Sequence, residues 1–560
     1  MRQFWMWWRD PSVLGSLIGI GLLATFASHP ATAADVAQPL TEPEIVAGAP
    51  EEQAVVPRSA SLTRLVPMSP AQYRAVKAAA QTSSAAPTAT QVALGHPSAP
   101  EPLTTDVTTS FTGLDRLTSI NNGFIFVPPD PIIAKSVLRV LQATNSAIRL
   151  TTTVGGVIQT SDLNTFFGAA TANGLVFDPK VFFDRNAVNR RFYVVGLQKT
   201  ATVSRLLLAI SRSSDPPNLN AVNWCRYSID ARRNVSTADA SYADYPGLGG
   251  GVDKLNVSVN NFRFSNDTFT FAIVRSFNKT IASNNAAACP AIAPFSTFQA
   301  TGTIGNISAF TLQPVQHYST PSSFPGITNP AYLVNSVFGA GNFYRVWRVF
   351  TNAGGAQALQ LLGNPIGNFA YNVPPDAPQT GSALLLDTGD NRVTQAAGNG
   401  NLISGVHATL CNLSGGANES CVRIVRILVS QNAAAMNQQG AFGVPNEFFF
   451  WPGIAVNISN QAGIPFHLVS PTRTGGRLSS WWCTKDSTSP ACTSVLPMTT
   501  GTCAQTTNRT GDYIGTALDP SDARSFWMSG ERAVMLNGAC QWQTQVIRVN
   551  PGLNVIPLTP

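Results

Sequence analysis

The stretch Ala243-Asp244-Tyr245-Pro246-Gly247-Leu248 decides the fold, because its pattern returns along the chain. An acidic or aromatic residue, often with Pro or Gly, stands just before an apolar strand. The same order recurs in Phe177-Asp178-Pro179-Lys180-Val181, Phe450-Trp451-Pro452-Gly453-Ile454 and Gly511-Asp512-Tyr513-Ile514-Gly515. After three of these phrases come a turn and a second strand. A short unit that recurs in this way predicts a repeat architecture.

Repeats of about 60 residues fill the chain from Phe111 to Pro560 if seven units are present. Further starts at Pro129-Asp130, Ala331–Asn335 and Leu384–Asp387 fit the gaps between the four phrases. Short β-branched and aromatic runs separated by turn residues are strands, and no amphipathic helix of useful length interrupts them. Radially stacked units of about four strands are propeller blades. We therefore expect an all-β, seven-bladed β-propeller; six or eight blades and two packed β-sandwich domains are the alternatives.

The N-terminal part of the chain has a different character. Arg2 and Arg9 precede an apolar run and the sequence Ala31-Thr32-Ala33, which is the layout of a cleaved signal peptide, and the run is too short for a stable membrane span. The next residues are rich in Ala, Pro and Thr, which is typical of a linker, and Ser69-Pro70-Ala71-Gln72 predicts one short helix. The predicted organisation is a signal peptide (1–33), a disordered linker (34–107) and a propeller (108–560).

The cysteines support export. All of them follow the signal segment and none forms a Cys-x-x-Cys pair, so disulfides fit better than metal ligation. Proximity predicts Cys411 with Cys421, and Cys483 with either Cys492 or Cys503. The complete set of disulfide candidates is Cys225, Cys289, Cys411, Cys421, Cys483, Cys492, Cys503 and Cys540. We expect a secreted, periplasmic or cell-surface protein.

Composition excludes some partners. Only 12% of the residues are charged, and the net charge is +7 over 560 residues. The 36 Lys and Arg residues are scattered, whereas a nucleic-acid binder concentrates them on one stripe. We therefore expect no nucleic-acid partner. The oligomeric state is left open.

Several phrases between Phe177 and Phe262 resemble a group of uncharacterised bacterial secreted propellers of the sialidase-like (BNR/Asp-box) superfamily. They are Phe177–Arg185, Leu207–Pro216 and Ala243–Gly249; Asp387–Arg392 is similar as well. Ser211–Asp215, followed by Trp224, resembles an Asp-box hairpin but has Pro217 where that box has glycine. The resemblance implies a propeller fold and an extracytoplasmic location. It does not imply an activity, because Asp boxes lie away from the catalytic centre and the sialidase set of three arginines, a Tyr nucleophile and an acid is not recognisable.

No common catalytic motif is present: the chain has no zinc-protease, nucleophile-elbow, phosphate-loop or dinucleotide pattern. The candidate ligand-binding residues are therefore acids, arginines and tyrosines near the expected blade starts, which could meet at one channel mouth. The alternative is a purely structural role, in which these residues cap turns or pair with neighbouring charged residues. The candidates are Asp178, Arg185, Asp244, Tyr245, Asp390, Arg392, Asp512 and Tyr513.

These observations favour a non-catalytic propeller that binds an extracellular glycan or protein. The alternative is a sialidase-like glycoside hydrolase acting at the channel mouth, and a purely structural envelope component is a third reading. No cofactor is expected. A calcium ion, which takes about 6 to 8 oxygen ligands, is the one ion that converging acids could hold.

Overall fold

The computed structural model describes residues 36–37, 58–61, 64–82, 91–94, 107–121, 123–185, 190–279, 289, 295–300, 309–362, 366–413, 417–473 and 476–551. The chain divides into two units, residues 1–35 and 36–560, and every described residue belongs to the second. The expected signal peptide lies outside the described residues, so it stays a prediction.

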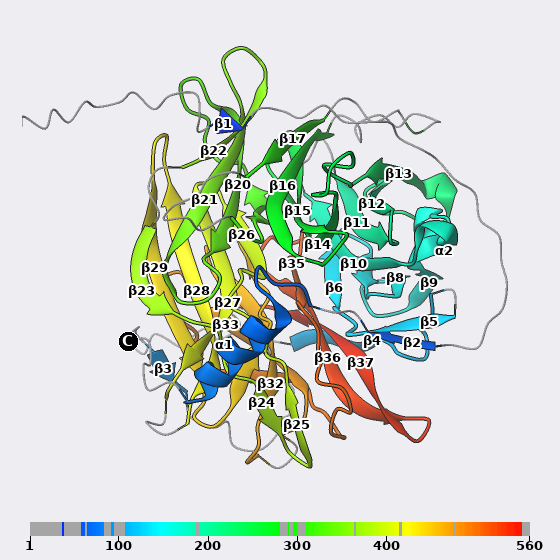
Figure 1. The fold of residues 1–560 in the computed structure, drawn as a ribbon, viewed down its shortest axis with the longest axis vertical. Coiled ribbons are helices and arrows are strands. Elements are labelled where there is room, and N and C mark those ends of the chain that lie inside the picture. Colours follow the sequence, from blue (N-terminus) through cyan, green and yellow to red (C-terminus); the bar gives the residue numbers. More distant parts are fainter. Residues whose placement is uncertain are drawn as a thin grey trace, which may run out of the picture. The chain divides into compact units, whose positions relative to one another are not determined.

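Most of the described chain forms antiparallel sheets in which consecutive strands lie side by side (Figure 1). Five blades have the regular form of four strands joined as a meander. The first blade has β6 (Ile132–Lys135), β7 (Val140–Ala143), β8 (Ala147–Thr151) and β9 (Val157–Asp162), and the second has β10 (Val176–Asp184), β11 (Arg191–Lys199), β12 (Ser204–Ser211) and β13 (Trp224–Asp230). The third has β14 (Ser241–Gly250), β15 (Lys254–Arg263), β16 (Phe269–Asn278) and β17 (Ser296–Gln299), and the fourth has β26 (Gln395–Asn399), β27 (Leu402–Cys411), β28 (Glu419–Val429) and β29 (Ala434–Gly443). The fifth has β35 (Gly515–Leu518), β36 (Phe526–Leu536), β37 (Ala539–Val549) and β4 (Val107–Asp115).

The last of these blades joins distant parts of the sequence. Strand β4 pairs antiparallel with β37, with Phe111 opposite Val546, so an early strand completes the blade formed by the C-terminal strands (Figure 1). The inner strands contact one another in a closed circuit that includes β18 (Gln313–Pro314) and β31 (Ala455–Val456). The contacts are β6 with β10, β10 with β14, β14 with β18, β18 with β26, β26 with β31, β31 with β35, and β35 with β6. A closed circuit of radially arranged sheets is a β-propeller, as predicted, and it excludes two packed sandwiches.

The predicted seven-bladed propeller, with six or eight blades as alternatives, is wrong, because the structure shows five blades. Two further large sheets have a different form. One is six-stranded, with β18 (Gln313–Pro314), β20 (Thr328–Ser336), β21 (Gly341–Thr351), β22 (Gln357–Leu361), β23 (Ile366–Tyr371) and β1 (Val36–Ala37); the other is five-stranded, with β30 (Phe448–Phe450), β31 (Ala455–Val456), β32 (Ala462–Val469), β33 (Ser479–Lys485) and β34 (Leu496–Thr499).

Two features make the sheets irregular. The inner strand of the five-stranded sheet is split into β30 and β31 on either side of Trp451-Pro452, whereas β10 and β14 stay continuous through Asp178-Pro179 and Tyr245-Pro246, which have similar positive φ values. Strand β19 (Gln316–Ser319) pairs in parallel with both β14 and β26 and merges two blades into one ten-stranded sheet.

The blades are apolar on both faces, because each packs between two neighbours. Along β10, Val181 and Phe183 pack toward β6–β9, whereas Phe182 packs toward β14–β16. Successive side chains of a strand point to opposite faces, so near-continuous apolar runs are expected in sheets that are buried on both sides.

Part of the segment expected to be a linker packs on the blades. Helix α1 (Pro70–Thr82) begins with the predicted capping box, in which the Ser69 and Gln72 side chains each accept a hydrogen bond from the other's backbone N–H. The helix is docked and not a transient element of a tether, because Lys77 is buried and donates to Pro374 O and Gly389 O. The remaining short elements are β2 (Arg58–Ser61), β3 (Gln91–Ala93), β5 (Phe124–Val127), β24 (Ala377–Gln379), β25 (Ser382–Leu386), α2 (Leu163–Phe167) and two 3-10 turns at Thr171–Asn173 and Ala221–Asn223.

Four disulfides link the cysteines. The predicted Cys411–Cys421 pair is confirmed, and of the two alternatives for Cys483 the structure has Cys483–Cys492. The other pairs are Cys225–Cys289 and Cys503–Cys540. Disulfides of this number are compatible with an extracellular or periplasmic protein. Among the described residues, no helix is long and apolar enough to cross a membrane.

Candidate functional site

In two blades, the recurring sequence phrase marks a bulge near the start of the inner strand. The pairing of β10 with β11 shifts register between Phe177 and Lys180, and the pairing of β14 with β15 shifts between Asp244 and Gly247. Asp178 and Tyr245 have positive φ values of 50° and 52°. Such backbone costs on the order of 1–3 kcal/mol per residue and re-aims the side chains beside it. Two neighbouring blades therefore both contain an energetically unfavourable backbone conformation near the start of the inner strand.

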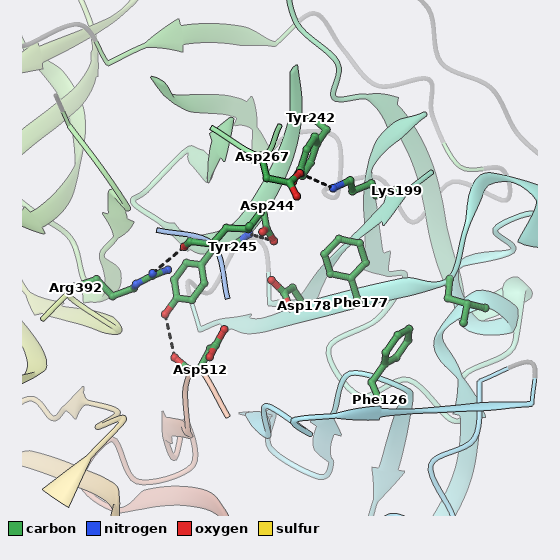
Figure 2. A pocket seen from close by; sticks show the side chains of 12 residues that line it. Phe126, Phe177, Asp178, Lys199, Tyr242, Asp244, Tyr245, Asp267, Arg392 and Asp512 are labelled. Carbon is green, nitrogen blue, oxygen red and sulfur yellow. Dashed lines mark hydrogen bonds and ion pairs between the residues drawn. The ribbon is translucent and has the colours of Figure 1, made fainter. Parts of the chain in front are cut away.

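A pocket of about 400 Å³ lies at these bulges (Figure 2). Charged side chains from several blades and a few apolar ones face it. The lining residues are Leu65, Phe126, Leu175, Phe177, Asp178, Lys199, Tyr242, Asp244, Tyr245, Asp267, Arg392 and Asp512.

The basic side chains of the pocket wall already have acidic partners. The Arg392 guanidinium donates from Nε and Nη2 to the Asp390 carboxylate, at 2.9 and 2.7 Å, and its carbon lies 4.4 Å from the centre of the Tyr245 ring. Burial alone would lower the pKa of Arg392, but Asp390 raises it above its ordinary value. Lys199 lies 3.4 Å from Asp267. Arg392 is therefore a fixed cation with its charge largely compensated.

Asp512 is an ionised carboxylate. Its Oδ1 accepts hydrogen bonds of 2.7 Å from Arg64 and from Arg509. Burial opposes ionisation, but the charges of Arg509 and Arg64 hold the pKa of Asp512 well below its ordinary value. Asp512 is thus held in its charged form by arginines on both sides.

Asp178 and Asp244 behave differently. Burial raises the pKa of Asp178 well above its ordinary value, and the nearby charges of Asp244, Asp130 and Asp512 raise it further. Burial raises the pKa of Asp244 to about 6, against the opposing effect of the Tyr245 backbone N–H. The pocket therefore combines two carboxyl groups that bind protons easily, Asp178 and Asp244, with one that stays ionised, Asp512.

Next to the pocket, two tyrosine rings and a lysine pack together. Tyr245 and Tyr513 pack edge to face, with ring centres 6.2 Å apart, and the Lys180 ammonium lies 2.8 Å from the centre of the Tyr513 ring. The Tyr513 hydroxyl donates to Pro179 O, and the Tyr245 hydroxyl donates to Asp512 O. Burial lowers the pKa of Lys180 to about 7 although Asp130 and Asp178 oppose the shift.

The structure brings most of the predicted site residues together. Asp178, Asp244, Tyr245, Arg392 and Asp512 line the pocket. Asp390 pairs with Arg392, and Tyr513 packs against the ring of Tyr245, but neither residue lines the pocket itself.

Arg185 is the exception. It follows the other end of β10, about 20 Å along the strand from Asp178, and lines a separate pocket of about 210 Å³ with Asp184 and His317. Arg185 is therefore not one of the candidates that line the larger pocket.

Several pocket residues could not be found from sequence. Phe177 stands beside a predicted site residue, but Phe126, Lys199, Tyr242 and Asp267 are on other strands and turns with no distinguishing pattern. Arg64 and Leu65 fall in the segment expected to be a linker. In the part of the chain that the structure describes, no three His, Cys, Asp or Glu side chains come close enough to hold a metal ion, so calcium stays a hypothesis.

The chain was compared with known proteins by sequence and by structure. No family model matches the chain. No curated protein sequence matches it either. Among solved structures, an α-L-arabinofuranosidase of Fusarium graminearum matches 79% of this chain over 98% of its own length, with 9% identity and a TM-score of 0.34. The phage phi92 endosialidase matches 66% of this chain over 66% of its own, with 9% identity and a TM-score of 0.37.

The Trypanosoma rangeli sialidase matches 72% of this chain over 57% of its own, with 8% identity and a TM-score of 0.35. Similarity at this level carries no information on ligand or activity. The fold and the pocket by themselves define a disulfide-linked β-propeller with one polar, ligand-sized pocket among the bulges of its inner strands.

Proposed function

We propose that this protein is an exported β-propeller that binds a saccharide in the pocket lined by Phe177, Asp178 and Asp244. The observation that carries the proposal is the combination of aromatic rings and carboxyl groups around one cavity (Figure 2). Aromatic faces pack against the C–H faces of sugar rings, and carboxyl oxygens accept hydrogen bonds from sugar hydroxyls.

The size of the cavity favours a small ligand over a protein surface. Ligand pockets measure about 300–1,000 Å³, and the volume of about 400 Å³ lies within that range. A stable protein partner would instead need a broad complementary face that buries about 1,000 Å² or more in total. The pocket therefore supports the glycan part of the predicted function.

The test is a binding screen of the full chain against neutral, acidic and amino saccharides. We expect Phe177→Ala to lower the affinity for the bound saccharide by about fivefold, because stacking on one aromatic ring contributes on the order of 1 kcal/mol. Phe343→Ala is the matched control, since Phe343 is half-buried on β21 and does not line the pocket. Saccharide binding that is equally strong in wild type and Phe177→Ala would contradict the proposed site.

Export is the second part of the proposal. The disulfides form in an oxidising compartment, and the N-terminal sequence predicts cleavage after Ala33. N-terminal sequencing of the protein recovered from the medium or periplasm should begin at Ala34. Recovery of the intact N-terminus in the cytoplasm would contradict export.

One observation favours glycoside hydrolysis as a second candidate. Two carboxyl groups with raised pKa, Asp178 and Asp244, share the cavity with the ionised Asp512. Carboxyl groups whose environments separate their pKa values are the usual acid and base of glycosidases. If hydrolysis occurs, Asp178→Asn or Asp244→Asn should lower turnover by about 10²–10⁴-fold with substrate binding retained. Unchanged turnover in both variants would exclude this site.

A further inference from the structure

The charges around the pocket do not balance. Lys199 has Asp267 as its acidic partner, Arg392 has Asp390, and Asp512 is paired with Arg64 and Arg509. Among the described residues, neither Asp178 nor Asp244 forms an ion pair, so these two carboxyl groups are left over.

Asp178 is the more enclosed of the two. The residue is 7% exposed, and the structure gives its carboxyl group no hydrogen-bond donor within the described ranges. Its remaining exposed surface faces the pocket (Figure 2). A buried carboxylate without a partner is costly, and this cost is the physical reason why Asp178 binds protons so readily.

Asp244 lies across the pocket on the next blade. Its Oδ1 accepts one hydrogen bond of 2.8 Å, from the Tyr245 backbone N–H. No other donor to its carboxyl group is present among the residues described. Lys180, whose charge acts on Asp178, is held over the Tyr513 ring and makes no ion pair with either carboxyl group within the described ranges. Both carboxyl groups therefore face a cavity whose two lining cations, Lys199 and Arg392, already have Asp267 and Asp390 as partners.

We propose that the saccharide bound in this pocket carries a free amino group, whose ammonium lies between the Asp178 and Asp244 carboxylates. This inference rests on the proposed saccharide-binding function. An ammonium supplies three hydrogen-bond donors and one positive charge, which are the two things that the carboxyl pair lacks.

Other ligand classes fit the same walls less well. An acidic sugar would bring its carboxylate to a wall whose arginines are already neutralised by Asp390 and Asp512. A calcium ion takes about 6 to 8 oxygen ligands, and two carboxyl groups supply at most four. A neutral sugar would leave the carboxyl pair without a cation.

The affinity for an amino saccharide should depend on pH. An ammonium pairs only with ionised carboxylates, so its binding must expel the protons that the pair holds. Other charged groups that face the pair are Lys180, Asp130, Asp512, Lys199 and Arg392. Because the pKa of Asp244 is about 6, the affinity for an amino saccharide should fall as the pH drops below about 6, by about tenfold per pH unit for each proton that must be released.

The experiment is titration calorimetry of the full chain with three oligosaccharides of equal length: glucosamine, N-acetylglucosamine and glucose oligomers. We expect the glucosamine oligomer to bind about 30-fold or more tightly than the acetylated one, and to release protons in buffers of different ionisation enthalpy. Asp178→Asn and Asp244→Asn should remove this preference, because they should lower the affinity for the glucosamine oligomer far more than the affinity for the neutral oligomers. Asp239→Asn is the matched control, because Asp239 precedes β14 but is exposed and pairs with Arg263.

Each outcome decides something different. Equal binding of amino and acetylated oligomers would overturn the ammonium site and leave the proposed saccharide function standing. If no oligomer binds to a protein that circular dichroism shows to be folded, both the ammonium site and the proposed saccharide-binding function would be overturned. Tight calcium binding that Asp178→Asn abolishes, without amine selectivity, would overturn the inference in favour of a metal.

Discussion

The Arg64 guanidinium donates from Nη2 to Oδ1 of Asp512 over 2.7 Å, although the two residues are 448 positions apart in the chain. Arg64 also pairs with Asp387, and its guanidinium carbon lies 4.3 Å from the centre of the Trp451 ring. The Arg64 side chain is only 3% exposed, and the next residue, Leu65, lines the pocket. This N-terminal segment is therefore an integral part of the pocket rim.

Replacing Arg64 should destabilise the fold. In Arg64→Met, the buried Asp387 and Asp512 lose their shared cation, so we expect a loss of about 3 kcal/mol in the free energy of unfolding, measured by denaturant titration. Arg74→Met is the matched control, since Arg74 is exposed on α1 and should change stability by less than about 0.5 kcal/mol. Equal midpoints for the two variants would contradict the structural role of Arg64.

The burial of Arg64 could not be predicted from the sequence around it. A segment rich in Ala, Pro and Thr has too little apolar surface to fold alone, and that local argument predicted a linker. Arg64 and Lys77 are nevertheless buried, because their acidic partners are supplied by Asp387, Asp512 and Asp376, hundreds of residues away. Composition cannot reveal a partner at such a distance.

The blade starts could be predicted because their signal is local. An acid or aromatic before Pro or Gly marks the bulge that opens an inner strand, so Asp178, Asp244, Tyr245 and Asp512 were found and do converge on one pocket. Blade regularity could not be predicted, since it depends on whether each inner strand stays continuous. The split at Trp451 and the pairing of β19 with two sheets depend on neighbouring strands.

Gly389 should tolerate no side chain. A Cβ there would clash with the indole of Trp451, on which Arg64 stacks, and the residue has a positive φ of 78°. We expect Gly389→Ala to cost about 3 kcal/mol, of which about 1 kcal/mol is the backbone term. Gly339→Ala tests that term alone, because Gly339 has a φ of 87° and open space around it. Similar unfolding midpoints for both variants would rule out the clash.

The Cys503–Cys540 disulfide should contribute strongly to stability, because it joins residues 37 positions apart. We expect Cys503→Ser with Cys540→Ser to lower the free energy of unfolding by about 4 kcal/mol, measured without reductant. Cys503→Ser alone should lose nearly the same amount, since either change breaks the cross-link. A non-reducing peptide map that places Cys503 with a different cysteine would contradict the pairing.

The buried histidines should make the protein sensitive to acid. His407 Nε2 lies 2.6 Å from the Tyr344 hydroxyl, and its Nδ1 lies 2.7 Å from Ala408 O. Burial, with the Arg423 charge, lowers the pKa of His407 to about 3. The unfolded chain, with a histidine pKa of about 6.5, therefore takes up the proton first on acidification, and stability that is fully present above about pH 6.5 is lost as the pH falls toward 3.

His407→Gln isolates this contribution, because His317 and His467 are unchanged in both proteins and their effects cancel. The variant should be less stable than wild type at pH 7, but the difference should shrink by about 2 kcal/mol between pH 7 and pH 5, measured by denaturant titration at each pH. Tyr344→Phe removes the same hydrogen bond without removing the imidazole, so its difference from wild type should stay constant over that range. A pH-independent difference for His407→Gln would mean that His407 is protonated as easily in the folded protein as in the unfolded chain.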